Sequence, residues 1–140
     1  MDLAECLEKG LLKRTKIDKE MIEKELIESR RDFLDARVSF KMGKSKWAII
    51  QCYYSIFHSA RALLFSFGLK ERSHLALSVF LDDIVIKKKL ESKYANDFKA
   101  AMFTRENADY RAEYSRERAE KLIEIAKEFN QKMKELVRKK

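Results

Sequence analysis

Apolar side chains recur at steps of three and four residues along most of the chain. This spacing places them on one face of an α-helix. The clearest series starts after Ser115 and comprises Ala119, Leu122, Ala126, Phe129, Met133 and Leu136. It predicts a final helix that packs along one side, in a bundle or in a dimer.

Two long helices are predicted in the first half of the chain. Residues 15–18 have the Thr-x-x-Asp form of a capping box, and the apolar stripe over 22–40 ends before Gly43. A second long helix is predicted over 45–67, where Gly68 ends it. At 1.5 Å per residue both would be about 35 Å long, so we expect them to lie antiparallel as the spine of a bundle.

Three further helices are predicted from the same pattern. Residues 2–14 form a short first helix, which could already end at Gly10. Ser73 caps a helix with apolar positions over 77–84, and another helix covers 90–109. The β-branched stretch 79–86 resembles a strand, but no partner strand is evident, and a helix is the better interpretation.

The composition favours few and long helices. The chain has 140 residues with no proline and three glycines, whereas a β-rich fold of this length needs many turn residues. We therefore predict an all-α, up-and-down bundle of four to five helices. It forms a single domain over 1–140, with a core over about 18–137.

The charge balance indicates acidic partners. The net charge is +8, which favours nucleic acid first. Each local cluster, at 30–31, 87–89 and 138–140, is also what a solvated helix face would show. No apolar run is long enough to span a membrane, and Cys6 and Cys52 are too few for a disulfide or zinc framework. A cytoplasmic location is expected by default.

Some polar side chains lie on faces that otherwise look buried. Tyr54, His58 and Arg61 share one face of the apolar helix 45–67, and a buried arginine needs a polar or acidic partner. Arg105 and Asp109, four residues apart, share a face with core positions of the helix 90–109. They could pair with each other, or Asp109 could bind Arg61 across the bundle and leave Arg105 free for an anion.

These polar side chains have two interpretations. They could form a satisfied network that specifies helix packing, or they could line a functional pocket or dimer groove. The tyrosines at 53, 54, 110 and 114 would add stacking faces beside arginines, as in many RNA-binding sites. His58 and His74 lack the neighbouring ligands of a metal site, so no metal and no cofactor are expected.

Two segments of the chain resemble the HEPN domain family. Residues 53–64 read YYSIFHSARALL, which resembles the second-helix signature of its prokaryotic, largely uncharacterised branch, and Ser73-His74 resembles its next helix start. Residues 105–110, RENADY, resemble its Arg-x-x-x-Asp-Tyr segment. The resemblance covers about residues 20–135 and implies a helical bundle that usually dimerises. It also implies a small nucleotidyltransferase as partner, in a toxin–antitoxin module or a fused protein.

Several HEPN branches are metal-independent ribonucleases that use an arginine followed by a histidine in the same segment. Arg105 matches the arginine, but the histidine position falls on Tyr110 or Arg111. A tyrosine with a pKa near 10 is a poor general base, whereas an arginine can still hold a phosphate with two hydrogen bonds. The segment is therefore better suited to binding than to cleavage.

The predicted function is that of a HEPN-type protein, a homodimer that binds RNA or a nucleotide and acts with a nucleotidyltransferase. The candidate binding residues are Arg105, Asp109, Tyr110, Tyr54, His58 and Arg61. One alternative is a divergent ribonuclease in which His58 or Tyr110 replaces the missing histidine. Another is a non-catalytic interaction module whose polar residues only specify packing.

Overall fold

The computed structural model describes residues 1–139. Lys140, the last residue of the basic cluster at 138–140, lies outside the described residues. The elements, in chain order, are α1 (Leu3–Glu8), β1 (Leu12–Arg14), α2 (Lys19–Lys41), α3 (Ser45–Ser66), β2 (Leu69–Glu71), α4 (His74–Ile86), α5 (Ser92–Tyr110) and α6 (Arg116–Arg138).

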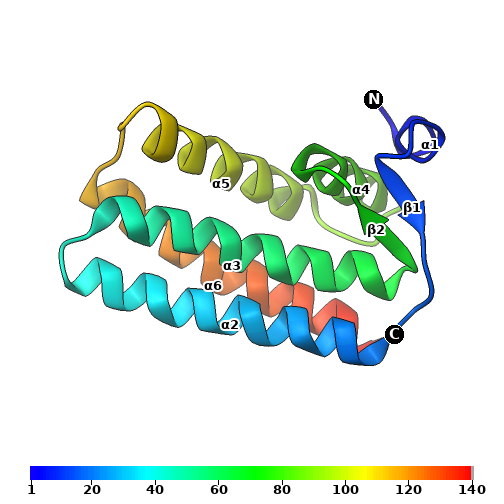
Figure 1. The fold of residues 1–140 in the computed structure, drawn as a ribbon, viewed down its shortest axis with the longest axis horizontal. Coiled ribbons are helices and arrows are strands. Elements are labelled where there is room, and N and C mark those ends of the chain that lie inside the picture. The colour runs from blue at the N-terminus through cyan, green and yellow to red at the C-terminus, as the bar shows by residue number, and fades with distance from the viewer. Residues whose placement is uncertain (140) are drawn as a thin grey trace.

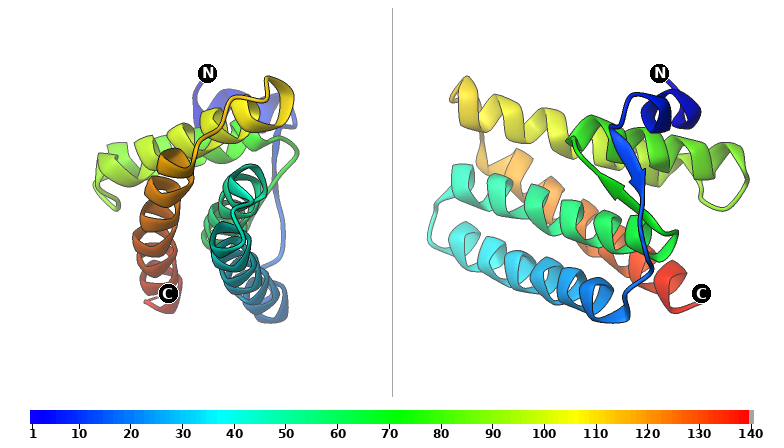
Figure 2. Two further views of the ribbon diagram at one scale, coloured as in Figure 1. Left: turned by 90° about the vertical axis from the view of Figure 1, so that its left-hand side faces the viewer. Right: turned by 45° about the vertical axis from the view of Figure 1, so that its right-hand side comes forward.

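The four long helices form an up-and-down bundle (Figure 1). Helices α2 and α3 lie antiparallel, α6 packs behind them, and α5 crosses above α3. Helices α1 and α4 and the two strands gather at one end of the bundle, as both Figure 1 and Figure 2 show. The predicted all-α bundle is confirmed.

Helix α3 occupies the centre of the bundle. It contacts α2, α6 and α5, and its residues Ile49, Tyr53, Ile56 and Leu64 are fully buried. This confirms that most of its apolar residues are covered by neighbouring helices, although Trp47, near its start, is 52% exposed. No helix among the described residues is long and apolar enough to cross a membrane.

A two-stranded antiparallel sheet was not predicted. Leu12 pairs with Glu71 and Arg14 with Leu69. The predicted helix over 2–14 is therefore wrong in its second half. It ends at Glu8, because Gly10 adopts a φ of +73° and the chain then extends to pair with β2. Strands of three residues carry no periodic signal, so only the contact with a distant segment reveals them.

The start of α2 also differs from the prediction. Asp18, rather than Thr15, is its N-cap, and the Asp18 carboxylate accepts hydrogen bonds from the backbone N–H groups of Glu20 and Met21. Thr15 instead donates its N–H to the carbonyl of Gly68. A Cβ on Gly68 would stand 3.3 Å from the Thr15 carbonyl oxygen, so this glycine permits the close approach of the two segments. The predicted Ser73 cap of α4 is confirmed, because its hydroxyl accepts from the Ala76 N–H at 3.1 Å.

Candidate functional site

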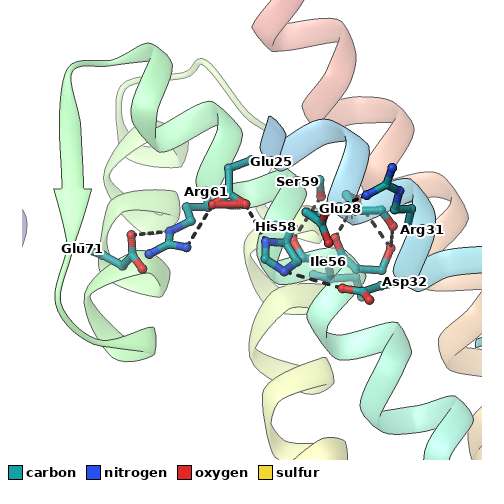
Figure 3. Close-up of polar contacts among 11 residues, drawn as sticks. Glu25, Glu28, Arg31, Asp32, Ile56, His58, Ser59, Arg61 and Glu71 are labelled. Carbon is teal, nitrogen blue, oxygen red and sulfur yellow. Dashed lines mark hydrogen bonds and ion pairs between the residues drawn. The ribbon is translucent and has the colours of Figure 1, made fainter. Parts of the chain in front are cut away.

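The two cations of α3, His58 and Arg61, are half-buried and paired with acids from α2 and β2. The Glu25 carboxylate accepts hydrogen bonds from His58 Nδ1 at 2.6 Å and from Arg61 Nη1 at 2.9 Å. Arg61 Nε donates to Glu71 at 3.0 Å, and His58 Nε2 lies 3.6 Å from Asp32. Figure 3 shows these side chains in one row between α2, α3 and β2. We call them the Glu25 network.

Protonation in the Glu25 network follows from these contacts. Burial by itself would lower the pKa of His58, but the hydrogen bond to Glu25 and the charges of Glu25 and Asp32 outweigh it and raise the pKa. Burial would likewise raise the pKa of Glu25, and its bonds to His58 and Arg61 instead lower it. His58 and Glu25 therefore form a charged pair that is satisfied within the fold.

The cross-bundle pair of Asp109 with Arg61 does not form, and that prediction is wrong. Arg61 is held by Glu25 and Glu71 and lies against the rings of Phe57 and Phe65. The alternative is confirmed: Arg105 Nη1 lies 3.6 Å from Asp109 on the same helix. The polar side chains of α3 and α5 therefore form two separate groups rather than one network.

The second group surrounds Arg105 on α5. Its guanidinium carbon lies 5.0 Å from the ring centre of Tyr53, 5.9 Å from that of Tyr54 and 5.7 Å from that of Tyr110. These distances are within the range of cation–π attraction. Arg105, Asp109, Tyr53, Tyr54 and Tyr110, together with His74, are called the Arg105 site below.

The charge of Arg105 is incompletely compensated. The residue is only 9% exposed, and its Nε has no hydrogen-bond partner among the described residues. Asp109 lies beyond ordinary hydrogen-bond distance, and its side chain is 37% exposed. A side-chain hydrogen bond with Tyr110 occupies another donor of the guanidinium. The unused Nε donor of this buried charge favours binding of an anion.

His74 joins the Arg105 site from the first turn of α4. Its Nδ1 shares a short hydrogen bond with the Tyr53 hydroxyl, and its ring lies 4.4 Å from that of Phe57. Burial, and next the positive charge of Arg105, lower the pKa of His74, so the imidazole is neutral near pH 7. Burial raises the pKa of Tyr53, which keeps the hydroxyl protonated.

The sequence prediction missed the part that His74 and Tyr53 take in this site. Tyr53 stood out only as one of several tyrosines, and His74 lacked neighbouring metal ligands. The Ser73 cap did place His74 in the first turn of a helix. Its contact with Tyr53, however, depends on the reversal of the chain through β2, which no local pattern specifies.

The two histidines predict opposite pH dependences of stability. His58→Gln should lower the free energy of unfolding by about 1–2 kcal/mol at pH 6, because charged hydrogen bonds to Glu25 are lost. The contribution of protonated His58 is complete below the ordinary pKa of 6.5 and is lost as the pH rises through its raised folded-state pKa. The difference from the wild type should therefore shrink toward pH 9.

His74→Gln is the matched control for this experiment. The lowered pKa of His74 contributes stability above pH 6.5, and this contribution is lost as the pH falls toward the folded-state pKa. Urea unfolding at pH 5 to 9 measures both differences. If the two variants showed the same pH dependence, the assignment of charges would be wrong.

Comparison with known proteins supports the family resemblance of the two segments at 53–64 on α3 and 105–110 on α5. A family model described as the HEPN domain matches residues 22–136, which is most of the chain and includes both α3 and the Arg105 segment. A comparison with curated proteins gives no match. Because the family model matches most of its residues, the chain belongs to the HEPN domain family.

Proposed function

We propose that the Arg105 site binds the phosphate of RNA or of a nucleotide. The observation that carries this proposal is the incomplete pairing of a buried arginine among tyrosine rings. A phosphate could accept hydrogen bonds from the guanidinium, and the exposed ring of Tyr110 could stack on a base. Asp109 and Tyr110, 37% and 75% exposed, border the site on its open side. Membership in a family of nucleotide- and RNA-related helical modules supports the same function.

His58 and Arg61 have a different place in this proposal. Their nitrogens face Glu25, Asp32 and Glu71, which already supply acceptors. We therefore expect them to support the position of α3 rather than to contact the ligand.

Two variants test the binding proposal. Arg105→Ala should weaken the binding of a fluorescein-labelled single-stranded RNA by at least about tenfold. The slope of the logarithm of the association constant against the logarithm of the salt concentration should also become shallower, by the amount that one lost phosphate contact contributes. Tyr110→Ala, at an exposed position, should weaken binding by about five- to tenfold through lost stacking without affecting folding. Fluorescence anisotropy measures both, with AMP and ATP as competitors.

Arg14→Ala is the control for these variants. Arg14 is an exposed cation on β1 and is not part of the Arg105 site, and its removal changes the net charge as Arg105→Ala does. Its loss should alter the affinity less than about twofold. Equal losses for Arg105→Ala and Arg14→Ala, with no loss for Tyr110→Ala, would indicate diffuse attraction to a basic protein. Absence of binding would leave the interaction module as the better interpretation.

A homodimer is also proposed, and the outer face of α5 supports it. Phe103 and Tyr110, seven residues apart, form an exposed aromatic stripe, with Phe103 64% exposed. Pairing of two copies through this stripe would bring their two Arg105 segments near each other. The family resemblance favours the same arrangement.

Phe103→Glu tests this dimer. Because the side chain is exposed, the substitution should leave the thermal midpoint of the isolated chain within a few degrees and convert the dimer to a monomer. Sedimentation velocity at several concentrations measures the change. A wild-type chain that sediments as a monomer at all concentrations would refute the dimer.

A small nucleotidyltransferase, in a toxin–antitoxin-like module, is the proposed protein partner. This part of the proposal rests on the family resemblance alone. A nucleotidyltransferase gene beside the gene of this chain, and co-purification of the two products, would test it.

Cleavage of RNA is the second candidate function, favoured by one observation. His74 is neutral and lies against Tyr53 in the Arg105 site, whereas both nitrogens of His58 face carboxylates. His74 therefore replaces His58 as the candidate for the missing base. A neutral imidazole can accept a proton from a ribose hydroxyl, which the Tyr110 phenol does poorly.

Incubation of end-labelled RNA with the protein and a chelator tests this candidate. Cleavage should be present in the wild type and fall at least about hundredfold in His74→Gln, while RNA affinity stays within about threefold. RNA that remains intact with the wild type would rule out metal-independent cleavage and leave binding as the function.

A further inference from the structure

A basic groove with apolar walls runs between α2 and α6, on a face that the Arg105 site does not reach. One section, of about 280 Å³, is lined by Leu26, Ile27 and Phe33 and by Lys127 and Lys134. A second section of about the same volume continues along the two helices to Phe40 and Ile123. Phe33 and Lys127 border both sections, so together they form one groove.

The walls of the groove are aliphatic and aromatic. Ile27 is 49% exposed, and Leu26, Phe33, Phe40 and Ile123 are half-buried. Apolar side chains that gather in a concave surface, rather than singly, are typical of an interaction site. In the first section, the Ser59 hydroxyl donates a hydrogen bond to the Asn130 side-chain oxygen at 2.7 Å, and these two residues give the groove a polar part.

The rim of the groove carries unpaired positive charge. Six basic residues and three acidic residues line its two sections. Arg30, Arg37, Lys127 and Lys134 make no ion pair with any described residue. One of the acids, Glu23, is already held by Arg138 through two contacts. The groove therefore attracts a ligand that is acidic at its edges and apolar at its centre.

We propose that this groove binds an acidic amphipathic helix of a partner protein. Such a helix would place apolar residues on the walls and carboxylates opposite the four unpaired cations. The lined part of α2, from Glu23 to Lys41, is about 27 Å long at 1.5 Å per residue, which suits a helix of about five turns.

Two other occupants fit the groove less well. A second copy of the chain would bring the same cations face to face across a two-fold axis, which opposes association. Nucleic acid would neutralise the rim, but its phosphates would leave the aliphatic walls uncovered. The proposal does not depend on the Arg105 site, because Arg105 faces α3 from a different helix.

A synthetic peptide provides the test. It has about 18 residues, with leucines on one helical face and glutamates on the other. The control peptide has lysines in place of the glutamates. The glutamate peptide should shift the ¹⁵N–¹H resonances of residues in the groove, such as Ile27, Phe33 and Ile123, and the lysine peptide should not.

Charge reversals on α6 locate the binding. Lys127→Glu with Lys134→Glu should weaken the glutamate peptide at least about tenfold. Arg118→Glu with Lys121→Glu changes the net charge equally, on exposed positions of α6 that line a different groove, and should change the affinity less than about twofold. Circular dichroism and thermal unfolding establish that all variants remain folded.

Three results would overturn the proposal. One is equal weakening by the two double variants, and another is resonance shifts that lie outside the groove. The third is displacement of the glutamate peptide by an RNA oligomer that shifts the same groove residues, which would assign this face to nucleic acid.

Discussion

The double engagement of Glu25 is the interaction on which the rest of the structure depends. Helix α3 is buried on nearly all sides, yet it carries two cations, and an unpaired charge in such a position is expensive. One carboxylate on α2 accepts from both His58 and Arg61. Glu71 completes the pairing of Arg61 and thereby connects β2 to α3. The register of α2 on α3 and the position of the small sheet follow from these contacts.

The Glu25 network and the Arg105 site differ in how completely their positive charges are paired, and this difference indicates which of them can bind a ligand. In the Glu25 network both nitrogens of His58 and two of the three guanidinium nitrogens of Arg61 meet carboxylates, so little is left for a ligand. In the Arg105 site the guanidinium meets three tyrosine rings and one distant carboxylate. Since aromatic faces compensate a charge less completely than carboxylates do, the Arg105 site retains the capacity to bind an anion.

The outer face of α5 and the groove between α2 and α6 differ in the side chains that they expose. The exposed stripe on α5 is aromatic and adjoins the Arg105 site, which suits a second copy of the same chain. The groove between α2 and α6 is basic with apolar walls, which suits an acidic protein segment. The groove lies on α2 and α6, so another protein could bind there while the Arg105 site holds a nucleic acid. The aromatic stripe on α5, by contrast, shares Tyr110 with the Arg105 site.

The sequence by itself determined those features that depend on near neighbours along the chain. Helical periodicity, the caps at Ser73 and Ser115 and the stops at Gly43 and Gly68 specified the long helices, because the hydrogen bonds involved span a few residues. The pairing of Arg105 with Asp109 was one of the two that the sequence left open, since the two residues lie one turn apart.

Only the tertiary structure decided which distant groups meet. Arg61 could have paired with any acid that the fold brought near it, and the chain reversal through β2 selected Glu71, while the packing of α2 selected Glu25. The β1–β2 pairing and the contact of Tyr53 with His74 likewise join segments far apart in sequence. Spacing along the chain carries no information about such contacts, because they depend on how whole helices pack and not on local backbone geometry.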